Sequence, residues 1–125
     1  MKNKVQKLQL KLIERASFNN FEGKKVVADL IEHKDLWRGV VMDRAGYSFR
    51  EQPSGEVIDL IKLRDIEDDY WNVDTLYILT SGKDDTKLVS LAKSWGADEI
   101  DWYDEEKSSD LMGGGDGKIL RIWFD

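Results

Sequence analysis

The sequence contains no cysteine, and histidine and proline occur only once each. The lack of cysteine excludes a disulfide framework, a thiolate metal site and a cysteine nucleophile. No run approaches the ~18 apolar residues that a membrane-spanning helix needs. The lysines near the start are not followed by the apolar segment of a secretory signal. We therefore expect a cytoplasmic protein that does not act at a membrane.

Basic residues are scarce in the second half of the chain. Residues 67–125 contain fifteen acids and six bases, whereas residues 1–15 contain one acid and five bases. An acidic half repels the phosphates of nucleic acids, so we expect no nucleic-acid partner. It suits a basic protein partner better, although a negative surface can simply keep a small domain in solution.

The length and composition predict one domain over residues 1–125. A chain of 125 residues, 41% of them hydrophobic, can bury a core of its own. We find no internal repeat and no interdomain linker. No family resemblance is close enough to carry functional residues over to this chain.

The clearest structural pattern is a βαβ unit over about residues 74–103. Residues 75–80 are β-branched, aromatic or apolar, as in a strand, and Asp84 or Asp85 can then cap a helix. The helix has apolar residues at spacings of three, four and seven, and a glycine separates it from a second strand over residues 99–103. We predict that the two strands form a parallel pair with a right-handed crossover.

The other segments have weaker patterns. Residues 3–16 combine helical spacing with strand-like alternation, and their good helix formers favour a helix. Residues 22–33 carry the apolar stripe of a helix, and residues 34–43 fit either a helix or a strand over residues 39–42. The remaining predictions are loops at 44–56 and 104–117, an acidic turn at 67–74, and strands at 57–66 and 119–124.

Together these elements predict an α+β (or α/β) fold. A helical N-terminal half would pack on a small mixed sheet that contains the βαβ unit and a C-terminal strand. We also expect residues 104–117, with their charges, serines and glycines, to be the most mobile internal segment. The predicted core comprises the apolar residues on the inner side of the helix and strands: Leu76, Ile78, Leu88, Leu91, Trp95, Ile100 and Ile122.

No catalytic motif occurs, so we predict no catalytic residue, no cofactor and no metal site. His33 stands alone near a predicted helix end, where the helix dipole alone accounts for it. Ser81 and Gly82 lie between a strand and a helix, as phosphate loops do, but lack the glycine pattern of such loops. The glycines within 113–117 lack the Lys-Ser/Thr of a P-loop, and the nearby carboxylates do not fit the EF-hand ligand positions.

Tryptophan is the most informative residue type. Trp71 lies among acids in the predicted turn, and Trp102 directly follows Asp101. Tryptophan is over-represented at binding hot spots, and surrounding acids would attract a basic partner. We therefore predict a binding surface that includes Trp71, Asp101, Trp102 and Asp104.

Two hypotheses follow from these patterns. In the first, the chain is a protein–protein interaction module, an inhibitor or immunity-type binder of a basic protein, and not an enzyme. In the second, it is a small enzyme or ligand-binding domain with a site at the C-terminal ends of the strands, near Ser81 and Asp101. A homo-oligomer that pairs through a sheet edge is compatible with either.

Overall fold

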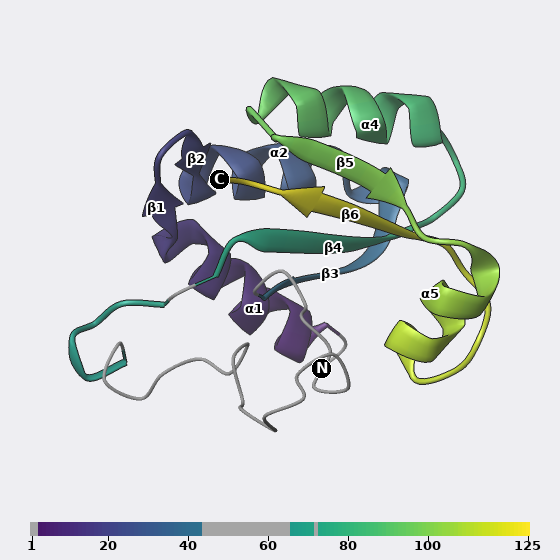
Figure 1. Ribbon diagram of the computed structural model, residues 1–125, viewed down its shortest axis with the longest axis horizontal. Coiled ribbons are helices and arrows are strands. Elements are labelled where there is room, and N and C mark those ends of the chain that lie inside the picture. Colours follow the sequence, from purple (N-terminus) through teal and green to yellow (C-terminus); the bar gives the residue numbers. More distant parts are fainter. Residues whose placement is uncertain (1–2, 44–65, 72) are drawn as a thin grey trace, which may run out of the picture.

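The computed structural model describes residues 3–43, 66–71 and 73–125 (Figure 1). The predicted loop at 44–56 lies outside the described residues, and so does the predicted strand at 57–66 except for Ile66. The described ranges form an α+β fold, as predicted, with helices in the N-terminal part and a C-terminal strand.

Four strands form the main sheet in the order β3-β4-β6-β5, and every neighbouring pair is antiparallel. These strands are β3 (Trp37–Asp43), β4 (Thr75–Thr80), β5 (Glu99–Trp102) and β6 (Ile119–Trp123). A small hairpin joins β1 (Ser17–Phe18) to β2 (Phe21–Glu22). The helices are α1 (Lys4–Arg15), α2 (Gly23–Glu32), α4 (Asp85–Ser94) and α5 (Glu105–Met112), with a 3-10 turn η1 (Lys34–Leu36).

The N-terminal half matches the predictions in its two helices. α1 and α2 occupy the segments predicted as helical at 3–16 and 22–33. For residues 34–43, the strand alternative holds rather than the helix, and β3 is longer than the predicted strand because it begins at Trp37. The spacing of apolar residues fits both a helix and a strand here. Val40 and Val41 are β-branched and pair with β4, so pairing within the sheet favours the strand.

Both strands and the helix of the predicted βαβ unit are present. Asp84 is the N-cap of α4 and accepts a 3.0 Å hydrogen bond from the backbone N–H of Lys87. Gly96 follows the helix with a φ of 83°, a left-handed conformation that glycine adopts without a steric penalty. β4 and β5 run in the same direction, because each is antiparallel to β6.

The prediction that β4 and β5 are hydrogen-bonded neighbours is wrong. β6 lies between them, and its Leu120 is opposite Ile78 of β4 on one side and Trp102 of β5 on the other. Local patterns locate the two strands and the helix that joins them, but they do not show that a later strand inserts between the two. Among the described strands, β3 and β5 are consequently the edges of the sheet.

The prediction of a loop throughout 104–117 is also wrong, because this segment contains α5. Asp104 caps the helix by accepting a 2.7 Å hydrogen bond from the backbone N–H of Lys107, and Gly113 ends it with a φ of 80°. The acids that indicated a loop occupy the cap and the first turn, where negative charge complements the helix dipole. The glycines that follow form the connection to β6.

The core lies between one face of the main sheet and helices α1, α2 and α4. Each helix contributes fully buried side chains, such as Ile13, Leu30 and Leu88. Five of the seven predicted core residues are buried, whereas Leu91 and Ile100 are half-buried at the margin of the core. The opposite face of the sheet is only partly covered, and α5 lies over one end of it (Figure 1).

Side chains of α1 close the free edge of β3. Gln6 donates a 2.7 Å hydrogen bond to the backbone C=O of Val40 and accepts one of 2.9 Å from its N–H. Gln9 accepts a 3.1 Å hydrogen bond from the N–H of Met42. An edge strand otherwise presents such groups to other chains, so these amides protect β3 from edge-to-edge pairing.

Candidate interaction surface

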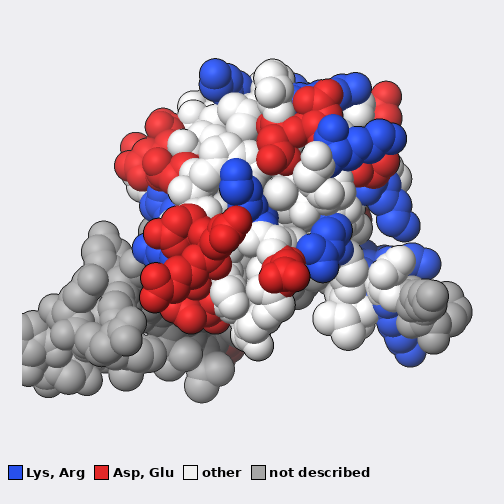
Figure 2. All heavy atoms as spheres, turned by 90° about the vertical axis from the view of Figure 1, so that its right-hand side faces the viewer, with Lys and Arg blue, Asp and Glu red and all other residues white. Residues whose placement is uncertain are grey.

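The acidic surface is centred on α5, directly after the end of β5. Residues 98–116 contain eight acids and one base. Figure 2 shows the end of the molecule where α5 lies, with acidic side chains gathered over one part of it. Glu105, Glu106 and Asp110 are exposed and form no ion pair with any described residue. These three carboxylates are therefore available to positively charged groups of another molecule.

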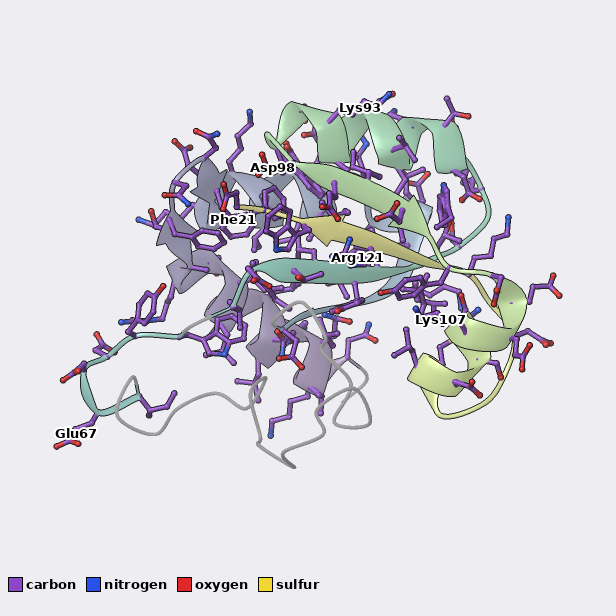
Figure 3. All side chains as sticks on the ribbon, in the orientation of Figure 1. Phe21, Glu67, Lys93, Asp98, Lys107 and Arg121 are labelled. Atoms are coloured by element: carbon purple, nitrogen blue, oxygen red, sulfur yellow. The ribbon has the colours of Figure 1, made fainter. Side chains whose placement is uncertain are left out.

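Asp101, in contrast, belongs to a salt-bridge network within the sheet. Its carboxylate and that of Glu99 each lie 3.0 Å from Nη1 of Arg121, the β6 residue that is labelled in Figure 3. Burial is the largest single effect and disfavours the charged guanidinium, but the hydrogen bond to Glu99 and the nearby Glu99, Tyr103 and Tyr77 side chains together outweigh it, so the pKa of Arg121 is raised. Asp101 thus has an internal partner, which reduces the charge that it offers to a binding protein.

Asp104 and Trp102 lie on either side of Tyr103, where β5 leads into α5. The carboxylate of Asp104 is occupied as the helix cap, so replacing it would alter the helix as well as the charge. The Trp102 side chain is 36% exposed at the end of edge strand β5, and Lys118 Nζ lies 5.8 Å from its ring centroid. Trp102 therefore presents a partly open aromatic ring beside the acidic helix.

Trp71 lies apart from the other three predicted site residues. It is half-buried against the core and lines a cleft of about 270 Å³ together with Leu12, Phe18 and Tyr70. Figure 3 labels Glu67, in the same short segment, at the opposite end of the molecule from Lys107 of α5. The structure therefore brings Asp101, Trp102 and Asp104 together and places Trp71 elsewhere.

The predicted binding surface left out four residues of α5, Glu105, Glu106, Asp110 and Leu111, because in a predicted loop nothing indicates which side chains lie on a common surface. On α5 they are exposed side chains at fixed positions of a helix. A signal for this helix was present, since Asp104 precedes two glutamates and Gly113 follows at the distance of two turns. An aspartate cap, acids in the first turn and a terminal glycine are the usual start and stop signals of a helix.

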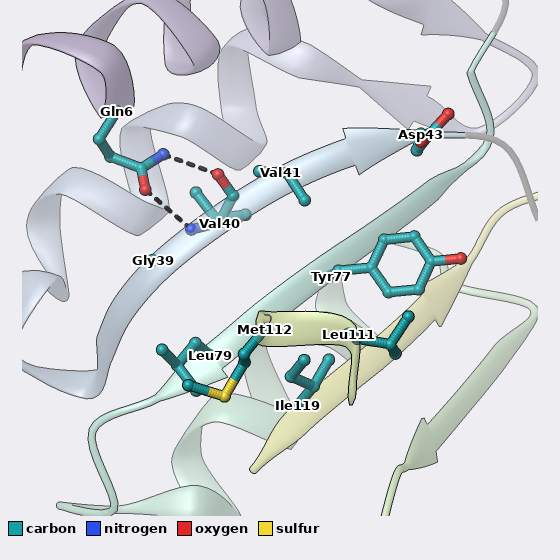
Figure 4. A pocket seen from close by; sticks show the side chains of 10 residues that line it. All are labelled: Gln6, Gly39, Val40, Val41, Asp43, Tyr77, Leu79, Leu111, Met112 and Ile119. Carbon is teal, nitrogen blue, oxygen red and sulfur yellow. Dashed lines mark hydrogen bonds between the residues drawn. The ribbon is translucent and has the colours of Figure 1, made fainter. Parts of the chain in front are cut away.

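An apolar cavity of about 570 Å³ lies on the face of the sheet opposite the core (Figure 4). Tyr77 and Leu79 of β4 and Ile119 of β6 form its floor. Leu111 and Met112 of α5 form one wall, and the N-terminal part of α1 and β3 border the other side. Its volume falls within the ~300–1,000 Å³ typical of sites that bind small molecules.

A second cavity, of about 610 Å³, is polar and lies beside the N-terminal part of α5. Ser81 and Gly82, which follow β4, line it together with Gly115 and Gly117. The structure therefore joins two segments that the sequence analysis considered separately as phosphate loops, while Asp101 lies outside the described lining. The charged side chains of the lining are two bases and four acids, namely Arg38, Lys118, Asp85, Glu105, Glu106 and Asp116. An excess of carboxylates does not suit phosphate.

Tyr103 connects the acidic surface to the apolar cavity. Its ring centroid lies 6.4 Å from that of Tyr77, which forms part of the cavity floor, and Lys107 Nζ lies 4.5 Å from the Tyr103 ring centroid. Burial is the main reason why the pKa of Tyr103 is raised. The phenol therefore stays protonated at neutral pH.

Over residues 3–43, 66–71 and 73–125, no three His, Asp or Glu side chains converge to hold a metal ion. None of the helices in these ranges combines the length and apolar character needed to cross a membrane. Comparison of the chain with protein-family models, curated proteins and solved structures found no match.

Proposed function

We propose that this protein is an interaction module that binds a basic partner protein, as an inhibitor or immunity-type protein does. Binding would use the acidic surface formed by α5 and the end of β5. The observation that carries the proposal is that Glu105, Glu106 and Asp110 are exposed and without an ion pair among the described residues, beside the partly open ring of Trp102. Unpaired acids and an exposed aromatic ring are the features that a basic partner would recognise.

The acids and the ring would act at different stages of binding. The carboxylates act through space, over a Debye length of about 8 Å at physiological ionic strength, and they steer the partner during its approach. Trp102 contributes only after contact, when burial of its ring removes apolar area from water. The charges should therefore determine the association rate, and the ring should determine the dissociation rate.

The test is to capture partners on the immobilised chain at low and high salt, and then to measure kinetics with the protein recovered. The double variant Glu106→Lys and Asp110→Lys should slow association. A matched control, Glu14→Lys with Glu32→Lys, changes the net charge equally at exposed positions of α1 and α2. This control should have a much smaller effect. Trp102→Ala should mainly speed dissociation, because it removes a short-range contact.

Two results would contradict the proposal. One is the recovery of no protein at low salt. The other is a partner whose association rate changes neither with salt concentration nor in the Glu106→Lys, Asp110→Lys variant. Asp101 and Asp104 are less suitable targets for this test, because the first is paired with Arg121 and the second caps α5.

The polar cavity favours a second candidate, a small enzyme or ligand-binding domain with its site at the C-terminal end of β4. The observation that supports it is the convergence of Ser81 and Gly82 with the glycine-rich connection around one space of about 610 Å³. A thermal-shift screen of small polar molecules tests this candidate, with Ser81→Ala as the variant that should reduce any stabilisation. A stabilising ligand that is unaffected by Ser81→Ala would place the ligand elsewhere.

A further inference from the structure

We infer that edge strand β5 accepts an extended segment of the basic partner as an additional strand of the main sheet. This inference rests on the proposed function and specifies how the partner makes contact. The backbone groups of Ile100 and Trp102 would bond to the added strand. Lysine or arginine on that strand would lie beside the carboxylate of Asp101.

The backbone groups of β5 alternate between those that face β6 and those that face away from it. The N–H of Tyr103, directly after β5, donates a 3.0 Å hydrogen bond to the C=O of Ile119 in β6. In an antiparallel pair this orientation recurs at every second residue, so Asp101 also bonds toward β6. The N–H and C=O groups of Ile100 and Trp102 therefore point away from the sheet. Among the described residues, these outward groups have no hydrogen-bond partner.

The opposite edge of the sheet is closed, and this contrast singles out β5. Side chains of Gln6 and Gln9 bond to the outward backbone groups of Val40 and Met42 in β3. No described side chain does the same for β5, and three of its four residues are exposed. An edge strand with unpaired backbone groups is a template to which an extended segment of another chain can add.

The two faces of β5 predict the residue pattern of the added strand. Ile100 packs against the core, so Trp102 lies on the same face of the strand and Asp101 on the opposite face. Glu99 and Asp101 share the guanidinium of Arg121, and the three side chains together keep one net negative charge. A basic residue beside Asp101 would balance this charge, because cross-strand pairs of opposite charge are favourable. Basic residues should therefore alternate with apolar residues, which would lie beside Ile100 and Trp102.

Charge disfavours a second copy of this chain as the added strand. Two copies related by a twofold axis would pair their β5 strands antiparallel. Pairing of each Ile100 with Trp102 of the other copy would place the two Asp101 side chains directly opposite each other. Pairing of the two Ile100 residues would place Glu99 opposite Asp101. Like charges in opposite positions destabilise a strand pair, and a basic strand avoids this repulsion.

A strand added along β5 would also reach the acids of α5. β5 runs toward this helix (Figure 1), and the cap residue Asp104 lies only two positions after Trp102. Glu105, in the first turn, is exposed and has no ion pair among the described residues. A basic segment that continues past Trp102 would therefore meet the acidic surface of the proposed function.

The first test uses the peptide Lys-Val-Lys-Val-Lys-Val-Lys in two forms with equal charge. One form is N-methylated at its three valines, whose N–H groups would face β5, and the other at three lysines, whose N–H groups would face away. The valine-methylated form should bind the full chain about tenfold more weakly at low salt, because it lacks the donors. The lysine-methylated form should slow amide exchange at Ile100 and Trp102. The Asp101 amide, which is already bonded to β6, should change little.

The second test alters the chain itself. Trp102→Pro removes an outward N–H without removing a bond to β6, and proline is tolerated at such positions of edge strands. Trp102→Ala is the matched control, because it removes the same ring and keeps the N–H. The proline variant should bind the unmethylated peptide about tenfold more weakly than the alanine variant does. The methylated peptides test the same contact on the unaltered chain, so the result does not depend on whether the proline variant folds.

The outcomes separate this inference from the proposed function. Equal binding of the two methylated peptides, weakened by salt and by Glu106→Lys with Asp110→Lys, would overturn strand addition and leave the acidic surface supported. Absence of binding by the unmethylated peptide would overturn strand addition, while the capture of partners would still decide the proposed function. Equal binding of a peptide with glutamate in place of lysine would overturn the basic character of the added strand. Self-association of the chain that Trp102→Pro abolishes would assign β5 to a second copy and overturn the inference.

Discussion

The side-chain amide of Gln6 bonds to the backbone of Val40 in the way that a neighbouring strand would. Its nitrogen donates to the C=O at 2.7 Å, and its oxygen accepts from the N–H at 2.9 Å. A helix side chain thus satisfies both outward groups of one residue in an edge strand. Because these groups are partly buried beneath α1, the free energy of unfolding should depend on this single glutamine.

Gln6→Ala should lower the free energy of unfolding by about 1–3 kcal/mol, because it leaves two backbone groups without their partners. The amide proton of Val40 should also exchange faster with solvent. Chemical denaturation and amide exchange measure the two effects. Lys7→Ala, at an exposed position of the same helix, should change neither. Unchanged protection of the Val40 amide in the Gln6 variant would show that the side chain does not hold this edge.

Gly23→Ala should be among the most destabilising small substitutions. A Cβ on Gly23 would lie 1.9 Å from the carbonyl oxygen of Ile13 and 2.7 Å from that of Ala16, so the start of α2 would have to move away from the end of α1. We expect a loss of about 3 kcal/mol, at the upper end of the usual overpacking range. Gly39→Ala is the control, because its nearest neighbour, Gln6 Oε1, would lie at an ordinary 3.6 Å. Equal effects of the two variants in thermal denaturation would refute the close approach of the helices.

Leu88 and Leu91 should differ in their contributions to stability, although both lie on the apolar side of α4. Leu88 is completely buried, whereas Leu91 is half-buried at the margin of the core. Leu88→Ala should cost about 2–5 kcal/mol, and Leu91→Ala only about 1–2 kcal/mol. Urea denaturation of both variants tests this order. A larger loss at Leu91 would mean that the helix is rotated about its axis relative to this structure.

Ser108→Ala should weaken the attachment of α5 to the sheet. The substitution removes the acceptor for the buried N–H of Ile119, and an unsatisfied buried donor costs about 1–3 kcal/mol. Ser109→Ala is a matched control on the same helix, since its hydroxyl makes no hydrogen bond to a described residue. The readout is the free energy of unfolding together with amide exchange along α5. Equal exchange in the two variants would contradict a structural role for the Ser108 hydroxyl.

The ion pair between Asp35 and Lys83 should be visible in a pH titration. Lys83 Nζ lies 2.7 Å from Asp35 Oδ2, and this hydrogen bond lowers the pKa of Asp35. A carboxyl whose pKa is lowered by folding stabilises the protein above its unfolded pKa, and this contribution is lost as the pH falls through the folded pKa. Lys83→Ala should therefore raise the pKa of Asp35, as followed by NMR. Lys87→Ala should raise it less, because Lys87 acts only through space.

The sequence predicted those parts of the fold that depend on neighbouring residues. The bounds of β4, the cap at Asp84 and the end of α4 near Gly96 follow from local propensity and spacing. The position of β6 could not be predicted in this way, because strand order depends on contacts between segments far apart in the chain. The hydrogen bonds by which Gln6 protects the edge of β3 could not be predicted either. A glutamine in a helix carries no sign of such a role until the position of the neighbouring strand is known.

The negative charge of the candidate surface was predicted, but its residues were predicted only in part. The excess of acids after residue 67 is a property of the sequence, so composition alone predicts that this part of the surface is negatively charged. The availability of each acid, in contrast, depends on tertiary contacts. Asp101 pairs with Arg121, twenty residues away, while Glu106 and Asp110 have no ion pair among the described residues. The sequence-based prediction therefore included Asp101, whose charge is already paired with Arg121 within the fold.

The insertion of β6 between β4 and β5 has a consequence for timing during synthesis. Among the described residues, β6 is the last strand of the main sheet along the chain, yet it supplies the only strand neighbour of β5. At about 5–20 residues per second, a ribosome completes β5 and α5 before the strand that holds them exists. The acidic helix and the cavity beside it can therefore take their places only after Trp123 has been added. The surface that we propose for binding a partner can therefore be complete only in chains that already contain β6.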